Sequence, residues 1–149
     1  MSVYKGILVA ADGSDPSKRA VERAARLAAH EETPLYILNV IRDMQFPESL
    51  KRMAEVERLV GSRSDLLHYV ADKILGDARK DARKQGAKTI EVRTAEGDPA
   101  TRIVEQADAD KADLIVIGTR GLGGVAGALL GSVSRKVSNL ADQDVLIVR

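Results

Sequence analysis

Short apolar runs alternate along the chain with longer segments that carry apolar residues at helical spacing. Continuous apolar runs of this length are typical of strands that are buried on both sides in a parallel sheet. The pattern therefore predicts an alternation of strands and helices. The expected strands cover residues 6–10, 34–40, 88–95, 113–118 and 144–149.

Helix start signals follow most of these runs. Asp15 is the expected N-cap of the first helix, with Pro16 as its first helical residue. Asp98 and Pro99 begin a later helix in the same way. Another helix is expected over about 132–140, directly before the last strand.

The longest helical pattern runs over about 50–85. Gly61 and Gly76 interrupt it, and glycine weakens helices, so the pattern fits either one helix or two. The apolar stripe predicted to face the core consists of Val56, Leu59, Val60, Leu67, Val70, Ile74, Ala78 and Ala82.

Five strands joined by helical crossovers predict one doubly wound α/β domain over residues 1–149. Right-handed crossovers place helices on both faces of a parallel sheet, and the expected strand order is 3-2-1-4-5. In that order the first and fourth strands are neighbours whose connections leave in opposite directions. Ligands of such sheets bind in the crevice that this divergence opens.

The composition of the chain narrows the range of expected binding partners and cellular locations. The formal net charge is +1, from 23 basic and 22 acidic side chains, which gives no overall attraction to nucleic acid or to membranes. Aromatic residues make up 3% of the chain, too few for a platform on which bases stack. The chain has no cysteine, which excludes disulfides and thiolate chemistry and fits a reducing compartment. Without a signal peptide or a long apolar span, we expect a cytoplasmic protein with no membrane insertion.

Six glycines fall between Gly118 and Gly131, directly after the most apolar strand. Glycine lets a ligand approach the main chain closely, and successive amides in such a loop can converge on an anion. Gly131 precedes the last helix, whose N-terminus adds unpaired N–H donors. Ser132 and Ser134 add hydroxyl groups. This combination predicts that main-chain amides bind a diphosphate or triphosphate.

Two common phosphate-binding motifs do not fit. A Walker A loop needs a Gly-Lys pair, and this segment has none. A dinucleotide fingerprint is matched by Gly121, Gly123 and Ala126, but it also requires an acidic residue at the end of the following strand. That strand ends in Arg149, so a Rossmann-type NAD site is not expected.

The remaining pattern is G-x-x-G, nine residues and then G-S, formed by Gly118, Gly121 and the pair Gly131–Ser132. It resembles the ATP-binding signature of the universal stress protein family. The resemblance extends to "ILVAADGSDPSKRAVERAARLA", to the Gly-Asp-Pro turn at 97–99, to "KADLIVIGTRG" and to "LLGSVSRKV" followed by "DVLIVR". Only residues 41–87 carry no marker of the family.

The resemblance implies a set of binding residues for ATP and magnesium. Main-chain groups at Val40 would hold adenine, and the turn at Ala10, Ala11 and Asp12 would approach the ribose and phosphates. Asp12 would also meet Mg²⁺, directly or through water. The residues that would hold the phosphates are Ile117, Gly118, Arg120, Gly121, Gly131, Ser132, Val133 and Ser134.

Several of these residues also have a purely structural interpretation. Asp12 can simply close an Asx turn before the first helix, and Ser132 can be a helix N-cap. Arg120 can be a solvated surface charge. Turn and capping roles are expected for Gly97 and Asp98, and surface positions for His30 and His68.

Three functions follow from these observations and stay open at this level. The first is an ATP-binding regulatory protein of the stress response, in which nucleotide sets conformation or partner choice. The second is a slow Mg-dependent ATPase or phosphoryl-transfer enzyme, and the third is a dimeric scaffold. Adenylyl transferases of related architecture use a His-x-Gly-His motif, and ATP pyrophosphatases of similar fold carry a Ser-Gly-Gly loop after the first strand. This chain has neither motif, so it offers few residues suited to catalysis. The apolar strand over 144–149 lies at an edge of the expected sheet, as in relatives that pair this strand with its copy, so we expect a homodimer through it.

Overall fold

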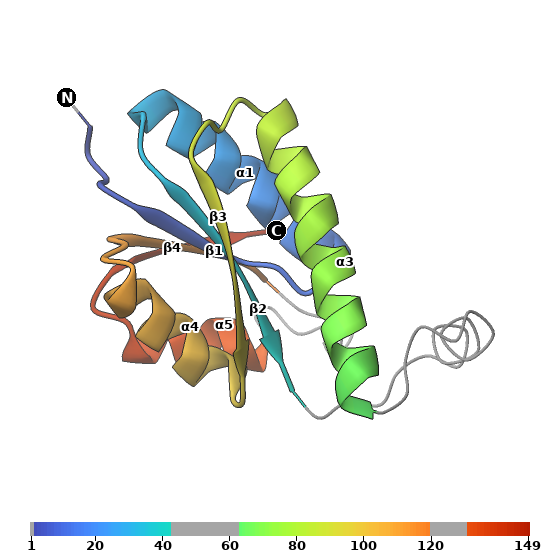
Figure 1. Cartoon of the computed structure of the whole chain (residues 1–149). Coiled ribbons are helices and arrows are strands. Elements are labelled where there is room, and N and C mark those ends of the chain that lie inside the picture. The colour runs from blue at the N-terminus through green and yellow to red at the C-terminus, as the bar shows by residue number, and fades with distance from the viewer. Residues whose placement is uncertain (1, 43–62, 120–130) are drawn as a thin grey trace.

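The computed structural model describes residues 2–42, 63–119 and 131–149. Its centre is a five-stranded parallel sheet with the strand order β3-β2-β1-β4-β5 (Figure 1). This confirms the predicted sheet and its order. The strands are β1 (Ile7–Ala10), β2 (Leu35–Ile41), β3 (Ile90–Glu96), β4 (Leu114–Gly118) and β5 (Asp144–Val148).

Helices cover both faces of the sheet, as predicted. On one face lie α1 (Asp15–Glu31) and α3 (Arg63–Lys84), and on the other lie α4 (Pro99–Ala109) and α5 (Ser132–Leu140) (Figure 1). None of the helices in the described ranges is long and apolar enough to cross a membrane.

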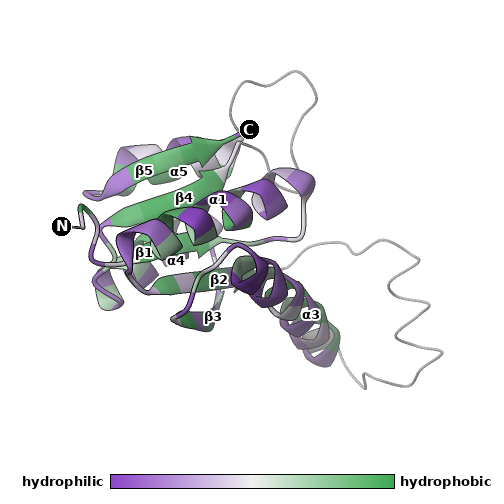
Figure 2. Cartoon of the chain, turned by 90° about the horizontal axis from the view of Figure 1, so that it is seen from above, coloured by the Kyte–Doolittle hydropathy of each residue, from purple (hydrophilic) through white to green (hydrophobic). Residues whose placement is uncertain are grey.

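Alternate residues of the central strands feed two separate cores. In β1, Ile7 and Val9 face α1 and α3, whereas Leu8 faces α4 and α5, and all three are fully buried. Burying a large aliphatic side chain contributes about 1.5–3 kcal/mol. Figure 2 shows the result as apolar strands between helices whose outer sides are polar. Because both faces are covered, β1 and β4 read as continuous apolar runs.

The first helix begins one residue earlier than predicted. Ser14 is its N-cap, in an extended conformation, and its hydroxyl oxygen accepts a hydrogen bond from Ser17 N–H (3.3 Å). Asp15 is the first helical residue, where a carboxylate suits the positive end of the helix dipole. The assignment of Asp15 as the cap was therefore wrong, because serine and aspartate are both strong capping residues and stand side by side.

The helix α3 runs without interruption through Gly76. A side chain at Gly76 would meet no atom within 4 Å, so this glycine lies over open space. The predicted stripe is confirmed at Ala78 and Ala82, which are buried, whereas Leu67, Val70 and Ile74 are only half-buried. The buried positions of α3 are Leu66, Ala71, Leu75, Ala78 and Ala82. Val56, Leu59, Val60 and Gly61 lie outside the described residues.

Candidate functional site

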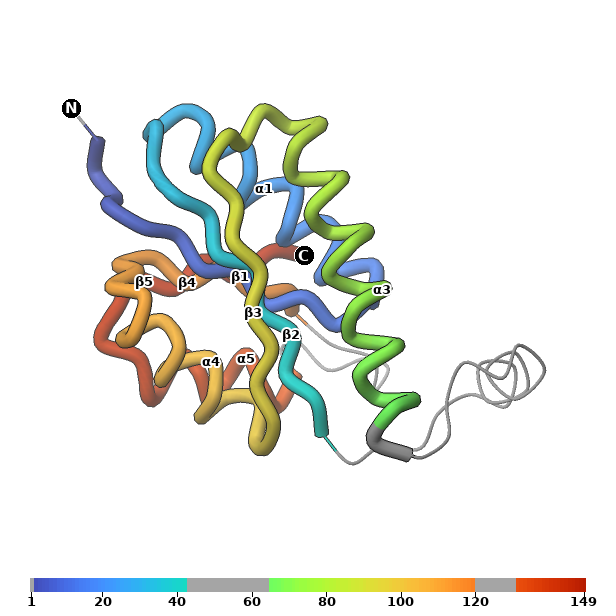
Figure 3. Tube along the Cα trace, viewed as in Figure 1, coloured from blue at the N-terminus to red at the C-terminus, as the bar shows by residue number. Residues whose placement is uncertain are grey.

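The candidate site lies at the carboxyl ends of β1 and β4. These strands are hydrogen-bonded neighbours, with Val9 opposite Val116. The chain leaves β1 into α1 on one face of the sheet, whereas α5, the helix that follows β4, lies on the other face (Figure 3). This is the switch point at which ligands of open α/β sheets bind.

The turn after β1 is tied firmly to β2. Ala11 N–H donates to the Leu38 carbonyl (2.9 Å), which extends the ladder one residue beyond β1. The Asn39 side chain donates through Nδ2 to the Ala11 carbonyl (2.8 Å). Ala11 and Asn39 are both more than nine-tenths buried. Both polar main-chain groups of Ala11 are therefore held by β2, and Ala10 precedes it as the half-buried end of β1.

A closed ring of hydrogen bonds shapes the rest of this turn. Asp12 N–H donates to Ser17 Oγ (3.1 Å), Ser17 N–H donates to Ser14 Oγ (3.3 Å), and Ser14 N–H donates to Asp12 Oδ1 (2.9 Å). Gly13 lies inside the ring with a φ of 85°, a left-handed conformation that favours glycine. The Asx turn predicted at Asp12 is confirmed.

Gly118, the first glycine of the signature, is required by packing. A Cβ atom built on it would lie 2.8 Å from the carbonyl carbon of Pro16 and 2.9 Å from the Pro16 Cβ. Pro16 belongs to the first turn of α1. The end of β4 and the start of α1 therefore approach each other as closely as they do because residue 118 has no side chain.

The start of α5 is less occupied than the turn after β1. Gly131 is the N-cap, in an extended conformation, and as a glycine it has no side chain that could cap the helix. Ser132 is the first helical residue and is exposed, so its interpretation as the N-cap was wrong by one position. Gly131 N–H donates to the Thr119 carbonyl (2.6 Å). Helical geometry gives no acceptor to the amides of residues 132–134.

Ser134 connects α5 to the end of β4. Its side chain is buried, and its hydroxyl lies 2.6 Å from the Gly118 carbonyl and 3.2 Å from the Thr119 carbonyl, to which it donates. The hydroxyl group therefore positions the end of β4. The Ser134 amide, in the first turn of the helix, is the group that has no acceptor within the helix. Val133 is half-buried and packs against the core under α4 and α5.

The other predicted residues fall in three places. Ile117 is buried in the core under α4 and α5, which leaves its main chain as the part near the site. Val40 lies near the carboxyl end of β2, opposite Ala95 of β3, and is half-buried. Arg120 and Gly121 lie outside the described residues. The structure thus brings the turn after β1, the end of β4 and the start of α5 together around Gly118.

A second polar group ties α5 to α4. Asp98 is the N-cap of α4 and accepts hydrogen bonds from Thr101 N–H (3.1 Å) and Lys136 Nζ (2.9 Å). The Lys136 bond, supported by those from Thr101, lowers the pKa of Asp98 to about 2. Gly97, in the preceding turn, has a φ of 127°. The predicted turn and capping roles of Gly97 and Asp98 are confirmed.

The histidines and acidic residues of the described ranges form no metal centre by themselves. His30 and His68 are exposed, as predicted, and His68 Nε2 lies 3.5 Å from Glu96 Oε1. Within residues 2–42, 63–119 and 131–149, no group of three or more histidine, aspartate or glutamate side chains could hold a metal ion. A divalent cation at Asp12 would therefore need further ligands from a bound anion or from water.

Comparison with known proteins identifies the family. The model of the universal stress protein family matches residues 3–149. The universal stress protein Rv1636 of Mycobacterium tuberculosis is 38% identical over 148 residues, which cover 99% of this chain and 98% of that protein. This chain belongs to the universal stress protein family.

Solved universal stress proteins share the fold. A universal stress protein whose crystal structure was solved in complex with cAMP is 37% identical to this chain, with a TM-score of 0.70. The match covers 99% of this chain and 98% of that chain. The universal stress protein of Archaeoglobus fulgidus, solved in complex with dAMP, is 26% identical with a TM-score of 0.70 and covers 99% of both chains.

Sequence reasoning missed two side chains that shape this universal stress protein site. Asn39 is a polar residue inside the apolar strand "LYILNVI", and that contrast was the available signal. Ser17 lies three residues beyond the Ser14 cap, where it closes the ring with Asp12. Both residues act on the main chain of the turn after β1.

Proposed function

We propose that this universal stress protein binds adenine nucleotides, with ATP as the ligand, and that bound nucleotide regulates its conformation or its choice of partner. The family membership and the relatives solved with cAMP and dAMP support an adenine nucleotide. The preference for a triphosphate is supported by the donors at the start of α5. The proposal includes a homodimer and a cytoplasmic location.

The start of α5 is the observation that carries the proposal. Its first-turn amides at residues 132–134 have no acceptor within the helix, its N-cap Gly131 has no side chain, and it lies against the end of β4 at the switch point. Unpaired N–H groups at a helix N-terminus, together with the helix dipole, favour a phosphate. Gly131 N–H already donates to Thr119, so the amides beyond it are the donors that we assign to phosphate.

The remaining parts of the nucleotide would lie toward β1 and β2. We assign adenine to main-chain groups at Val40 and the ribose to the turn at Ala10–Asp12. The half-buried Asp12 carboxylate fits a role as a Mg²⁺ ligand, because oxygen ligands suit this ion and phosphates and water would complete its shell. When bound, the ion would neutralise phosphate charge. Arg120 and Gly121 remain phosphate contacts of the proposal.

The homodimer is proposed through β5. This strand is an edge of the sheet, and its apolar side chains Val145, Leu146 and Ile147 are half-buried. Asp144 N–H and the Val148 carbonyl bond to the β4 side, so alternation turns the main-chain groups of Val145 and Ile147 outward. An apolar edge strand of this kind invites pairing with a second copy.

A pair of variants at Ser132 tests the phosphate site. Proline is tolerated at the first position of a helix, so Ser132→Pro removes one amide N–H while α5 remains formed. Losing a hydrogen bond to a charged group costs about 1.5–3 kcal/mol, so we expect ATP affinity to fall roughly tenfold or more. Titration calorimetry with ATP, AMP and adenosine measures this.

Ser132→Ala is the matched control, because it removes the hydroxyl group and keeps the amide. We expect it to retain nearly all ATP affinity, and we expect adenosine, which has no phosphate, to bind Ser132→Pro as it binds the wild type. Equal ATP affinity of the proline variant and the wild type would remove α5 from the site.

Mass spectrometry of nucleotide that is retained on purification separates this function from the slow ATPase. Retained ATP supports the binding protein, whereas ADP that accumulates with time supports hydrolysis. A protein that neither retains nor binds an adenine nucleotide contradicts both.

A further inference from the structure

The edge strand β3 exposes main-chain groups that are open to another strand unless something covers them. The Thr89 carbonyl accepts from Leu35 N–H, and Gly97 N–H donates to the Ile41 carbonyl, so the odd-numbered residues of this segment point toward β2. Alternation along a strand then turns the main-chain groups of Ile90, Val92, Thr94 and Glu96 outward. A row of this kind is a template for pairing with a second copy.

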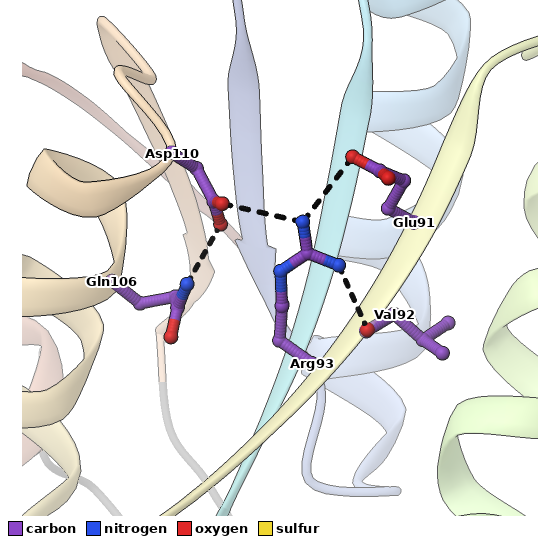
Figure 4. Close-up of polar contacts among 5 residues, drawn as sticks. All are labelled: Glu91, Val92, Arg93, Gln106 and Asp110. Carbon is purple, nitrogen blue, oxygen red and sulfur yellow. Dashed lines mark hydrogen bonds and ion pairs between the residues drawn. The ribbon is translucent and has the colours of Figure 1, made fainter.

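Two of these four outward carbonyls are occupied by arginine side chains. Arg93 Nη1 donates to the Val92 carbonyl (3.2 Å; Figure 4). Arg102 Nε, from α4, donates to the Glu96 carbonyl (2.8 Å). A strand that approached β3 would have to displace both guanidinium groups before its own N–H groups could reach these acceptors.

Arg93 is held in place by a network on the α4 side of the sheet. Its Nη2 lies 3.2 Å from Glu91 Oε2 and 3.3 Å from Asp110 Oδ1, and Asp110 Oδ2 accepts from Gln106 Nε2 (2.9 Å; Figure 4). The guanidinium carbon also lies 5.5 Å from the centre of the Tyr36 ring. With Asp110 only 11% exposed, this arginine is fixed over the edge by more than a surface ion pair.

Arg102 is held by different contacts. Its Nη1 donates to Glu105 Oε2 (2.6 Å) one turn further along α4. A Cβ atom on Gly97 would lie 2.9 Å from Arg102 Nε, so the missing side chain at Gly97 leaves the space through which this arginine reaches the end of β3. The left-handed φ of Gly97 adds a second reason for glycine at this position.

Among the described residues, the opposite edge has no such cover. In the described part of the chain, no side chain donates to the outward carbonyls of Val145 and Ile147 on β5. We infer that Arg93 and Arg102 close the β3 edge against a second copy of this chain and so confine sheet-edge association to β5. Without them, a copy could add to each edge, and such contacts build open-ended assemblies rather than a closed dimer.

The double variant Arg93→Thr with Arg102→Ala tests this inference. Threonine suits a strand and alanine a helix, so the replacements fit their elements. In sedimentation velocity over a concentration series, we expect the mass-average of the double variant to rise to roughly twice that of the wild type or beyond. The matched control is Arg79→Ala with Arg83→Ala, which makes the same charge change on exposed positions of α3 and should leave the wild-type mass unchanged.

A proline added to the double variant checks the route of association. Thr94 is exposed and its N–H points outward, so Thr94→Pro blocks pairing at the edge without removing a bond to β2. We expect it to restore the wild-type mass. A folded double variant of wild-type mass at every concentration overturns the inference, as does association that survives Thr94→Pro or that also appears in the control. If thermal melting shows the double variant to be unfolded, Arg102→Ala alone, which frees the Glu96 carbonyl and keeps the Arg93 network, must show a smaller concentration-dependent rise that Thr94→Pro removes, or the inference fails.

Discussion

The turn after β1 and the start of α5 meet at the same end of the sheet, yet they differ in how their polar groups are used. In the turn, the amides of Ala11, Asp12 and Ser14 already donate to groups of the protein. At the start of α5, the N-cap Gly131 has no side chain, and the first helical residue, Ser132, is exposed. The turn after β1 is therefore fixed by contacts within the protein, whereas the amides at the start of α5 have no acceptor within the helix.

This difference suggests a division of labour. A turn whose conformation is fixed before binding loses little conformational entropy when a ligand binds, which favours affinity. Unpaired amides at a helix N-terminus provide the attraction to an anion. Under the proposed function, the turn after β1 would set the position of the nucleotide and α5 would bind its phosphates.

The largest expected effect comes from the residue that both sides share. Gly118→Ala places a Cβ atom against the backbone of Pro16. The Gly118 carbonyl also accepts a hydrogen bond from the Ser134 hydroxyl. Overpacking of this kind costs about 1–3 kcal/mol, and we expect the upper part of that range because backbone rather than a flexible side chain must move. Urea unfolding at equilibrium measures the loss.

Gly76→Ala is the matched control for this prediction. Gly76 lies in α3 with nothing within 4 Å of the new methyl group, so alanine should stabilise the helix by up to about 1 kcal/mol. If Gly118→Ala were as stable as the wild type, the close approach of α1 to β4 would not depend on this glycine.

A smaller loss of stability is expected from Asn39→Leu, which weakens only the turn after β1. It leaves the buried Ala11 carbonyl without the side-chain donor that it has now, at a cost of about 2 kcal/mol. Thr33→Val, two residues before β2, is the control, because the buried Thr33 Oγ1 has no partner in the described structure. Thr33→Val should be nearly neutral. Denaturant unfolding measures both, and faster exchange of the Asp12 amide should accompany the loss in Asn39→Leu alone.

The smallest effect concerns the ion pair that ties α5 to α4. The pKa of Asp98 is about 2 in the folded protein, below its usual value of 3.8, with Lys136 as the main cause. The depressed pKa means that the pair stabilises the fold above about pH 4 and that this contribution is lost as pH falls toward 2. Because both side chains are half-exposed, we expect about 0.5 kcal/mol.

Lys136→Met checks this contribution. The stability difference between this variant and the wild type should be largest near neutral pH, should shrink between pH 4 and pH 2, and should also shrink in high salt. A difference that is independent of pH over this interval would show that packing of the lysine stem, rather than its charge, stabilises the start of α4.

The sequence predicted the sheet and its order because buried parallel strands leave a strong signal in short apolar runs such as 113–118. It could not place the boundary between Ser14 and Asp15, since both residues cap helices well and the choice depends on which side chain reaches the amide of Ser17. The predicted stripe of α3 is correct at Ala78 and Ala82 but not earlier in the helix, because this helix packs against both β2 and α1, which periodicity alone does not reveal.

At the site, the sequence indicated which residues contribute polar groups, but not which of these groups already form hydrogen bonds within the protein. The Asp12 amide and the Ser134 hydroxyl are engaged within the protein, and only the folded chain brings Ser17 and the end of β4 within their reach. Likewise, no local pattern indicates that Asn39 reaches across 28 positions to Ala11. Tertiary hydrogen bonds of this kind have no periodicity to detect.

The packing of Pro16 on Gly118 changes what the signature can diagnose. A chain of this fold that had lost its ligand long ago would still need glycine at that position, since α1 would still press against the end of β4. Sorting members of the family into binders and non-binders should therefore give little weight to the first glycine. Under the proposed function, the residues at the start of α5 would be the more informative marker.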